Sequence, residues 1–329
     1  VVVHGRRTAI GRAKRGAFKD TTPDELLSTV MSAVLKDVGL SPDKLGDVCV
    51  GNVLQPGAGA LMARVAHFLS VESMSLRSVG NPGDLSSRLM DTDGARDCII
   101  PMGITSENVA ERFGVSREKQ DAFALRSQQK AARAQSSGLF EQEIVPVATK
   151  IVDTDGTERA VTVAKDEGIR AGTSLAGLGK LRPAFKPDGS TTAGGSAVEA
   201  LGLPVLGVLR ASAVVGVPPD VMGIGPAFAI PAALKQAGLT VDDIEVFEIN
   251  EAFASQAVYC VEKLGIPLEK VNPNGGAIAL GHPLGCTGAR QVVTLLNELR
   301  RRGRRAYGVV SMCIGTGMGA AAVFEYPGP

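Results

Sequence analysis

The sequence of 329 residues has few histidines and almost no net charge. Its only histidines are His4, His67 and His282. The 35 lysines and arginines nearly balance 34 aspartates and glutamates, so no overall basic field would draw the chain to nucleic acid or to a membrane surface. There is also no run of about eighteen apolar residues to cross a bilayer. An anionic ligand would therefore be held by local groups.

Cysteine is also scarce, and its spacing argues against a zinc site. An odd number of cysteines in a large chain fits a reducing compartment. The five are Cys49, Cys98, Cys260, Cys286 and Cys313. We interpret the first four as structural, since free cysteine is commonly buried. Cys313 differs because a glycine-rich turn follows it, where backbone N–H groups could bind an oxyanion and the thiol could act as an acid or a base. A buried strand cysteine is the alternative.

The hydrophobic content of 44% and the 40 glycines allow a substantial core, in one large domain or in two fused halves. The chain opens on an apolar run, residues 1–4, which predicts a strand with no leading segment before it. On this interpretation any targeting peptide has been removed or omitted.

Two segments with the same pattern predict an internal duplication. Residues 33–41 resemble residues 232–240, and in each a glycine ends the expected helix. Short apolar runs over 47–52 and 245–250 then predict buried strands. Helices that alternate with buried strands favour parallel βαβ units, so we expect two similar halves.

The second copy is complete, whereas the first is not. After its strand, the second copy has an expected helix over 252–264, a glycine-rich loop over 272–288, a helix over 289–302 and a strand over 306–312. The first copy continues only through an expected helix over 62–70. A loop, a helix and a strand, on the order of 35 to 40 residues, are therefore missing near the Ser70–Val71 junction.

Residues 101–195 are more polar in pattern than the two copies and predict an inserted, more solvated subdomain. Ser106 and Ser116 are expected helix N-caps. The sequence predicts a polar amphipathic helix over 118–136 and an exposed hairpin over 145–163.

Two further positions have the pattern of a functional site. His282 lies in the glycine-rich loop, where the backbone can approach a ligand closely and Pro283 restricts the chain. His4 and His67 lie in apolar patterns, which favours structural roles. Asn250 follows a strand at its carboxyl end, where open α/β sheets bind ligands, although a helix N-cap is the alternative. The arginine-rich run 300–305 closes a helix, so we prefer a solvated helix end to a phosphate site.

Together, Asn250–Phe253, Gly281-His282-Pro283 and Cys313–Gly317 resemble the three C-terminal signature blocks of the thiolase family. The resemblance extends from Val1 to Tyr326 and is strongest to peroxisomal 3-ketoacyl-CoA thiolases. It implies an α/β fold of two duplicated βαβ halves stacked as five layers, with an inserted loop domain. The implied domains are the N-terminal half over 1–73, the loop domain with a remnant of the return to the first half over 74–197, and the C-terminal half over 198–329.

The sequence departs from the family pattern in two places. The block Asn-Arg-x-Cys-x-Ser-Gly, which carries the nucleophilic cysteine at a helix N-terminus, has no counterpart and belongs at the Ser70–Val71 junction. The family's glycine- and serine-rich stretch that helps to hold CoA is also shortened, at residues 195–201. Because both absences coincide with whole structural elements, we favour omitted residues or a spliced form over gradual divergence.

The resemblance implies thiolytic cleavage of 3-ketoacyl-CoA in β-oxidation, with CoA as a substrate and no metal or bound redox cofactor. His282 would activate the missing nucleophile, and Asn250 would position a water in the same oxyanion hole. Cys313 would shuttle protons, and the N–H of Gly315 would serve a second oxyanion hole. A homodimer in the peroxisome is implied, with a mitochondrial or cytoplasmic location as the alternative.

Two other functions stay open. A condensing ketoacyl synthase shares the fold but uses two histidines, whereas only His282 lies in a motif here. A catalytically dead remnant that binds CoA or dimerises follows from the missing nucleophile. We expect that a chain with only these 329 residues does not catalyse thiolysis.

Overall fold

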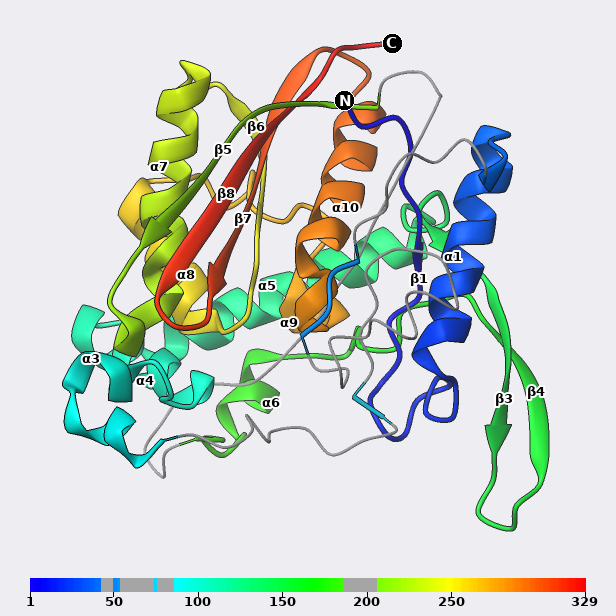
Figure 1. The fold of residues 1–329 in the computed structure, drawn as a ribbon, viewed down its shortest axis with the longest axis horizontal. Coiled ribbons are helices and arrows are strands. Elements are labelled where there is room, and N and C mark those ends of the chain that lie inside the picture. The colour runs from blue at the N-terminus through cyan, green and yellow to red at the C-terminus, as the bar shows by residue number, and fades with distance from the viewer. Residues whose placement is uncertain (43–49, 54–73, 76–85, 186–205) are drawn as a thin grey trace.

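The computed structural model describes residues 1–42, 50–53, 74–75, 86–185 and 206–329. In these ranges helices pack on both faces of a four-stranded sheet, and the N-terminal segment lies beyond one of those helical layers (Figure 1). The strands of the sheet are β5 (Val208–Gly216), β6 (Ile244–Ile249), β7 (Ala306–Ile314) and β8 (Met318–Tyr326). Their order is β5-β8-β7-β6. β6 and β7 are parallel, and the other two pairings are antiparallel.

The sheet is covered on both faces because its central strands are apolar on both sides. On one face, Phe247 and Val309 pack with helices α7 (Gly225–Ala237) and α8 (Ala254–Leu264). On the other face, Val246 and Val310 pack against helix α10 (Thr287–Arg301), which contributes Leu295, Leu296 and Leu299. The result is a helix–sheet–helix sandwich with a close-packed interior.

The N-terminal segment adds further layers on the far side of α10. Strand β1 (Arg7–Thr8) pairs in parallel with β2 (Ile144–Val145), and helix α1 (Pro23–Val38) contacts both strands. A Cβ at Gly5 would lie 2.8 Å from Cγ2 of Val293, so the segment before β1 packs closely on α10. Figure 1 shows the resulting order from left to right: α7, the sheet, α10, β1 and α1.

The inserted segment contains helices and a hairpin that flank this sandwich. Its elements are η3 (Ser87–Asp91), α3 (Asp93–Asp97), α4 (Met102–Phe113), α5 (Arg117–Ser136), β3 (Val147–Val152), β4 (Glu158–Val163) and α6 (Leu175–Gly179). α4 contacts α8 and the 3₁₀ helix η4 (Pro219–Ile224), while α5 contacts α8 and α9 (Ala277–Leu280). The hairpin of β3 and β4 projects away from the sandwich (Figure 1). Thus the expected hairpin and the expected polar helix are both confirmed, and the helix packs on the C-terminal half.

The two helix ends of the duplicated pattern agree with the prediction. α1 ends at Gly39 with φ +63°, and α7 ends at Gly238 with φ +67°, so each glycine closes its helix in the left-handed conformation. Of the expected strand over 47–52, only residues 50–52 are described, and they belong to no strand. The expected helix over 62–70 lies outside the described residues.

Two local expectations were wrong, and one alternative is excluded. In the expected strand 1–4, only Val2 forms a bridge, to Gly207, and the first strand begins at Arg7. Ser106 lies inside α4 instead of capping it, and its hydroxyl contacts that of Ser255 at 2.7 Å. Asn250 is not a helix cap, because the N-cap of α8 is Phe253. Val2 and Ser106 thus each contact a residue that is distant in the sequence.

Candidate active site

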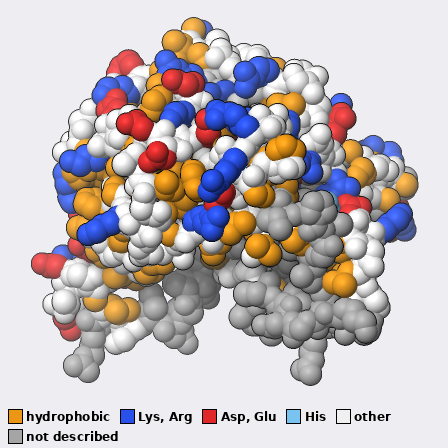
Figure 2. Space-filling view, turned by 90° about the horizontal axis from the view of Figure 1, so that it is seen from above, with side chains coloured by type: hydrophobic (Ala, Val, Ile, Leu, Met, Phe, Trp, Pro, Cys, Tyr) orange, Lys and Arg blue, Asp and Glu red, His pale blue; other side chains and the backbone are white. Residues whose placement is uncertain are grey.

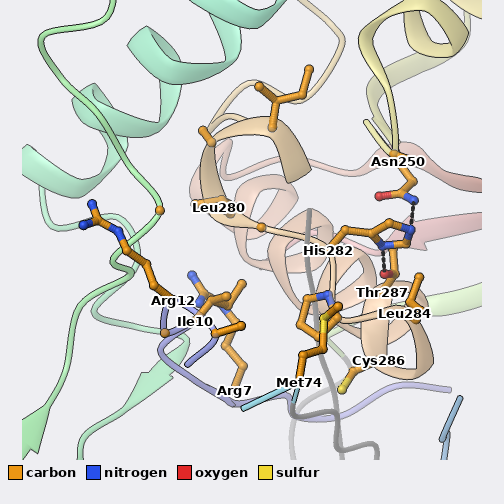
Figure 3. A pocket seen from close by; sticks show the side chains of 18 of the residues that line it. Arg7, Ile10, Arg12, Met74, Asn250, Leu280, His282, Leu284, Cys286 and Thr287 are labelled. Carbon is orange, nitrogen blue, oxygen red and sulfur yellow. Dashed lines mark hydrogen bonds between the residues drawn. The ribbon is translucent and has the colours of Figure 1, made fainter. Parts of the chain in front are cut away.

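All four residues predicted as catalytic line one cavity of about 1110 Å³. Asn250 follows β6, His282 follows α9, and Cys313 and Gly315 lie at the end of β7. Since β6 and β7 are parallel neighbours, their carboxyl ends meet at one edge of the sheet. Figure 3 shows the His282 ring between the side chains of Asn250 and Thr287.

The glycine-rich loop brings His282 to the cavity by a short helix and a sharp turn. α9 ends at Gly281, whose φ of +123° is rarely adopted by residues with a side chain. A Cβ at Gly276, which precedes α9, would lie 2.2 Å from Cδ of Glu251. Both glycines are therefore required by the packing of this loop.

His282 is held by one hydrogen bond on each ring nitrogen. Its Nδ1 lies 2.7 Å from Oγ1 of the buried Thr287, and its Nε2 lies 3.4 Å from Nδ2 of Asn250. The amide Nδ2 of Asn250 can only donate, so Nε2 accepts and the ring proton sits on Nδ1, facing Thr287. This tautomer leaves the lone pair of Nε2 on the side of Asn250.

His282 is neutral at physiological pH. Burial lowers its pKa to about 4, and the positive charge of Arg290 adds to the effect. A neutral imidazole can accept a proton from a thiol when the lone pair of Nε2 leaves its long 3.4 Å contact with Asn250. The site therefore contains a base that is ready in its active form.

Cys313 has the opposite preference, for its protonated form. Burial raises the pKa of its thiol to about 12. The thiol contacts Oε1 of Gln256, on α8, at 3.6 Å. A thiol of this kind is an acid that carries its proton at neutral pH, and its thiolate, once formed, is a strong base.

The turn after Cys313 is tight and rich in glycine. β7 runs on to Ile314, two residues further than expected, and β8 begins at Met318. Gly317 has φ +98°, and a Cβ there would lie 2.4 Å from the carbonyl oxygen of Val217. The turn that carries Gly315 is therefore held against the segment that leads into η4.

Glu251 anchors the strand end that carries Asn250. Its buried carboxylate accepts hydrogen bonds from the hydroxyl of Ser127 at 2.5 Å, from the side-chain amide of Asn272 at 2.7 Å and from the backbone N–H of Ile278 at 3.1 Å. Burial nevertheless raises the pKa of this carboxyl. The three donors come from α5, a loop and α9, so one side chain ties Asn250 to the helix that precedes His282.

A buried ion pair lies next to this anchor. Arg290 of α10 donates to Glu248 of β6 at 2.8 Å, and both side chains are almost fully buried. Burial raises the pKa of Glu248 to about 7 despite the lowering effect of Arg290. Gln291 donates to the carbonyl oxygens of Glu248 and Ser311, and thereby links α10 to both parallel strands.

Cationic side chains line another part of the cavity. Arg12 and Arg170 are among the lining residues, and Nε of Arg12 donates to the backbone carbonyl of Glu167. Arg7 also lines the cavity but is buried between Glu143 and Asp166, to which it donates at 2.8 and 2.7 Å. Burial alone would lower the pKa of Arg7, but these two carboxylates raise it. Arg7 is therefore a structural link. The guanidinium of Arg12, in contrast, forms no ion pair with a carboxylate among the described residues.

The arginine-rich run 300–305 forms ion pairs, which fits the expected helix end. Its partners are Glu245, Glu298 and Glu325. On the face shown in Figure 2, Lys and Arg side chains lie among Asp, Glu and hydrophobic residues. The described surface on this side thus matches the balanced charge of the sequence.

The chain returns to the cavity close to the junction where the first copy is interrupted. Met74 and Ser75, which follow Ser70–Val71 by a few residues, line the cavity together with His282. Figure 3 places Met74 close to Cys286, below His282. The described chain therefore resumes at the cavity wall three residues after Val71.

Sequence reasoning missed several residues of this site. Thr287, Glu251 and Arg290 hold or tune His282, yet all three have ordinary helix or turn patterns in the sequence. Cys286 was expected to be structural. It is buried but also lines the cavity.

The part of the chain that the structure describes contains no cluster of three or more His, Cys, Asp or Glu side chains that could hold a metal ion. None of the described helices is long and apolar enough to span a membrane.

A mixed α/β fold with a histidine, a cysteine and an asparagine at one cavity defines the class of protein. The C-terminal domain family of thiolases matches residues 203–326, and the N-terminal domain family matches residues 1–71 and 68–198. The chain belongs to the thiolase family, as its motifs indicated.

Individual relatives show which thiolases the chain is similar to. The chain is 66% identical to human peroxisomal 3-ketoacyl-CoA thiolase, over all of this chain and 91% of that protein. It is 48% identical to peroxisomal 3-ketoacyl-CoA thiolase 1 of Arabidopsis thaliana, over all of this chain and 88% of that protein. The crystal structure of the dimeric peroxisomal thiolase of Saccharomyces cerevisiae is similar with a TM-score of 0.85 at 43% identity, covering 98% of this chain and 96% of that one. These matches confirm the thiolase-like α/β fold.

The same comparisons bear on the interrupted first copy. The two matches to the N-terminal family meet at residues 68–71, where the sequence pattern placed the gap. The alignment with the human relative runs over 385 positions, although this chain has 329 residues, so dozens of aligned positions have no residue here. The relatives therefore carry internal segments that this chain lacks.

Proposed function

We propose that the protein, when it carries the nucleophile segment that is missing at Ser70–Val71, acts by thiolase chemistry, the cleavage of 3-ketoacyl-CoA by CoA to acetyl-CoA and a shortened acyl-CoA in β-oxidation. The observation that carries this proposal is that His282, Asn250 and Cys313 line one cavity in a chain of this family. Its relatives are peroxisomal, which gives the location of the reaction.

The reaction has two stages, acylation of the nucleophilic cysteine and transfer of the acyl group to CoA, and we assign a role to each site residue in them. A cysteine thiolate from the segment at Ser70–Val71 would attack the keto carbon, and Nε2 of the neutral His282 would accept the thiol proton. The bond between C2 and C3 breaks, and acetyl-CoA leaves as an enolate, which Cys313 protonates. CoA then gives its proton to the Cys313 thiolate and attacks the acyl group. The shortened acyl-CoA forms, and the nucleophilic cysteine leaves as a thiolate that takes its proton back from His282. A thiol pKa near 12 makes Cys313 suitable both as the acid and, after it has lost its proton, as the base.

The developing charges need fixed donors. Asn250, with a water, would stabilise the enolate oxygen, and the N–H of Gly315 would stabilise the oxyanion that forms on the acyl group. Arg12 and Arg170 could meet CoA phosphates at the cavity, since guanidinium groups bind phosphate well. The division into three domains, 1–73, 74–197 and 198–329, stays a prediction.

A homodimer is the proposed assembly, supported by the yeast relative, which is dimeric. Sedimentation of the protein at micromolar concentration tests it, with twice the chain mass as the expected result.

Two alternatives make different predictions. The condensing synthase would need a second histidine at the site. His4 instead lies 3.0 Å from Asp37, away from the cavity lining, and His67 lies outside the described residues. The catalytically dead remnant predicts CoA binding without turnover, and the missing nucleophile favours it for the chain as it stands.

The decisive experiment restores the internal segments of the peroxisomal relatives at Ser70–Val71 and at 195–201, and measures the CoA-dependent loss of acetoacetyl-CoA. Turnover is the expected result. The matched control is the same protein with serine in place of the inserted nucleophilic cysteine, which should be inactive. A restored, folded protein that cleaves no 3-ketoacyl-CoA of any chain length contradicts the proposal.

A further inference from the structure

The Cys313 thiol has an unusual side-chain neighbour. Oε1 of Gln256 accepts from its S–H at 3.6 Å, and the Gln256 side chain is only 2% exposed. Gln256 lies in the first turn of α8, so it is attached to a helix and not to a mobile loop. An apolar residue at this position would satisfy packing equally well.

The packing around Gln256 keeps its amide in this place. A Cβ at Gly223 of η4 would lie 2.0 Å from Cδ of Gln256, so only glycine leaves room for the amide group. One turn further along α8, Cys260 donates to the carbonyl oxygen of the same Gly223 at 3.5 Å. Gly223 is therefore in contact with two side chains of α8, Gln256 and Cys260.

Half of this buried amide has no partner. Within the described residues, Nε2 of Gln256 is buried and makes no hydrogen bond. A buried N–H group without a partner is unfavourable and uncommon, and it calls for a functional explanation. Rotation of the amide by half a turn about its last torsion angle would exchange the positions of Oε1 and Nε2.

We propose that Gln256 is the positioning residue that stabilises Cys313 in both of its protonation states. In the thiol state the carbonyl oxygen of Gln256 accepts from S–H. In the thiolate state the rotated amide donates N–H to the sulfur. The proton moves only between Cys313 and the substrate, so Gln256 neither gains nor loses one. This inference deepens the proposed function, because it rests on Cys313 as the group that shuttles protons.

A buried Cys313 thiolate would need a nearby group to stabilise its negative charge. The other titratable side chains around Cys313 are His282, which lines the same cavity, and Cys260 on α8. Burial raises the pKa of the Cys260 thiol, and His282 is neutral in the resting protein, so neither supplies a positive charge to a Cys313 thiolate that forms there. A neutral N–H donor is then the available source of stabilisation.

The test measures the ionisation of Cys313 directly, by its rate of alkylation with iodoacetamide at a fixed alkaline pH, read by mass spectrometry of the Cys313 peptide. Only the thiolate reacts, so the rate reports its population. Gln256→Met, which keeps length and volume without a polar group, should slow alkylation by roughly 3- to 10-fold, as expected for the loss of one hydrogen bond to an anion. Gln256→Glu should slow it further, because a carboxylate beside the sulfur repels the thiolate.

The other cysteines serve as internal controls. Cys98 and Cys286 should keep their rates, and the buried Cys260 should stay unreactive if the variants are folded. A general loss of packing would instead expose Cys260 and speed every reaction. A measurement on the unmodified protein is independent of any variant: the side-chain amide resonances of Gln256 should shift as pH rises in step with the alkylation rate of Cys313.

Unchanged Cys313 alkylation in both folded variants, or an amide signal that does not respond to pH, overturns the role of Gln256. Because neither readout depends on turnover, such a result leaves the proposed thiolase activity untouched. Conversely, a slowed alkylation in a restored protein without thiolysis would contradict the proposed function alone.

Discussion

His282 shows how a single side chain is tuned by its neighbours. Thr287 holds Nδ1, Asn250 lies at Nε2, and burial together with Arg290 keeps the ring neutral. If the ring were charged, it could not take a proton from a thiol. The site therefore depends on the orientation and on the neutrality of the same imidazole.

Thr287→Val tests the orientation. Valine has nearly the same shape but cannot accept from Nδ1, so the ring would lose its fixed tautomer. In a protein with the restored segments we expect kcat to fall about 10-fold with little change in KM, as one lost buried hydrogen bond implies. Thr287→Ser, which keeps the hydroxyl, is the matched control and should retain most of the activity. Equal losses in both variants would point to packing and not to the hydrogen bond.

The neutrality of His282 predicts a dependence of stability on pH. Its pKa is about 6.5 in the unfolded chain and about 4 in the folded protein, so the unfolded state binds the proton more readily. The contribution of His282 is complete above pH 6.5 and is lost as pH falls towards 4. We expect a loss of about 1–3 kcal/mol, because the ring is partly exposed.

Urea unfolding of the wild type and of His282→Asn at several pH values in this window measures that loss. The difference between the two proteins removes the contribution of the carboxylates, including Glu248, whose raised pKa acts in the opposite direction. A difference that stays constant with pH would contradict the lowered pKa of His282.

At the scale of the elements, β6 and α10 are joined by the buried pair of Glu248 and Arg290. Arg290→Met should leave Glu248 buried without a partner and lower the free energy of unfolding by about 3–5 kcal/mol. The double variant Glu248→Leu/Arg290→Met should recover most of this, since it removes both charges. Urea titration of the wild type, of Arg290→Met and of the double variant at neutral pH measures these free energies of unfolding. A double variant as unstable as Arg290→Met would show that packing, and not the charge, determines the effect.

The elements that could be predicted from the sequence are those whose signals are local. The glycine that ends α7, the polar pattern of α5 and the alternation in the β3–β4 hairpin each depend on nearby residues. Ser106 was misassigned because its partner, Ser255, is distant in the sequence. The motif residues of the site were found because glycine, proline and histidine stood together. Thr287 and Gln256 were not recognised, because their roles depend on contacts that only the folded chain creates.

At the scale of the whole molecule, the candidate base His282 and the candidate acid Cys313 come from residues 206–329, while part of the cavity wall comes from α1 and from Met74 and Ser75. Leu26, Leu27 and Val30 of α1 face this cavity. In the proposed mechanism the nucleophile comes from a segment at Ser70–Val71, so that segment would have to reach this cavity for the reaction to proceed. The interrupted copy thus bears on the function as well as on the stability of the protein.

The 329-residue chain should therefore have no thiolysis activity and a lower melting temperature than the protein with restored segments. Without the inserted cysteine there is no acyl-enzyme, and Cys98 cannot replace it, because its thiol sits at the end of a five-residue helix and contacts backbone carbonyls. An absent helix and strand would also leave apolar faces uncovered, a serious loss when total stability is typically about 5–15 kcal/mol. Intact mass, acetoacetyl-CoA cleavage and thermal unfolding should be measured on one preparation. A stable protein of 34.0 kDa that cleaves the substrate would refute the need for the segment. A larger mass would show that the protein carries the segment.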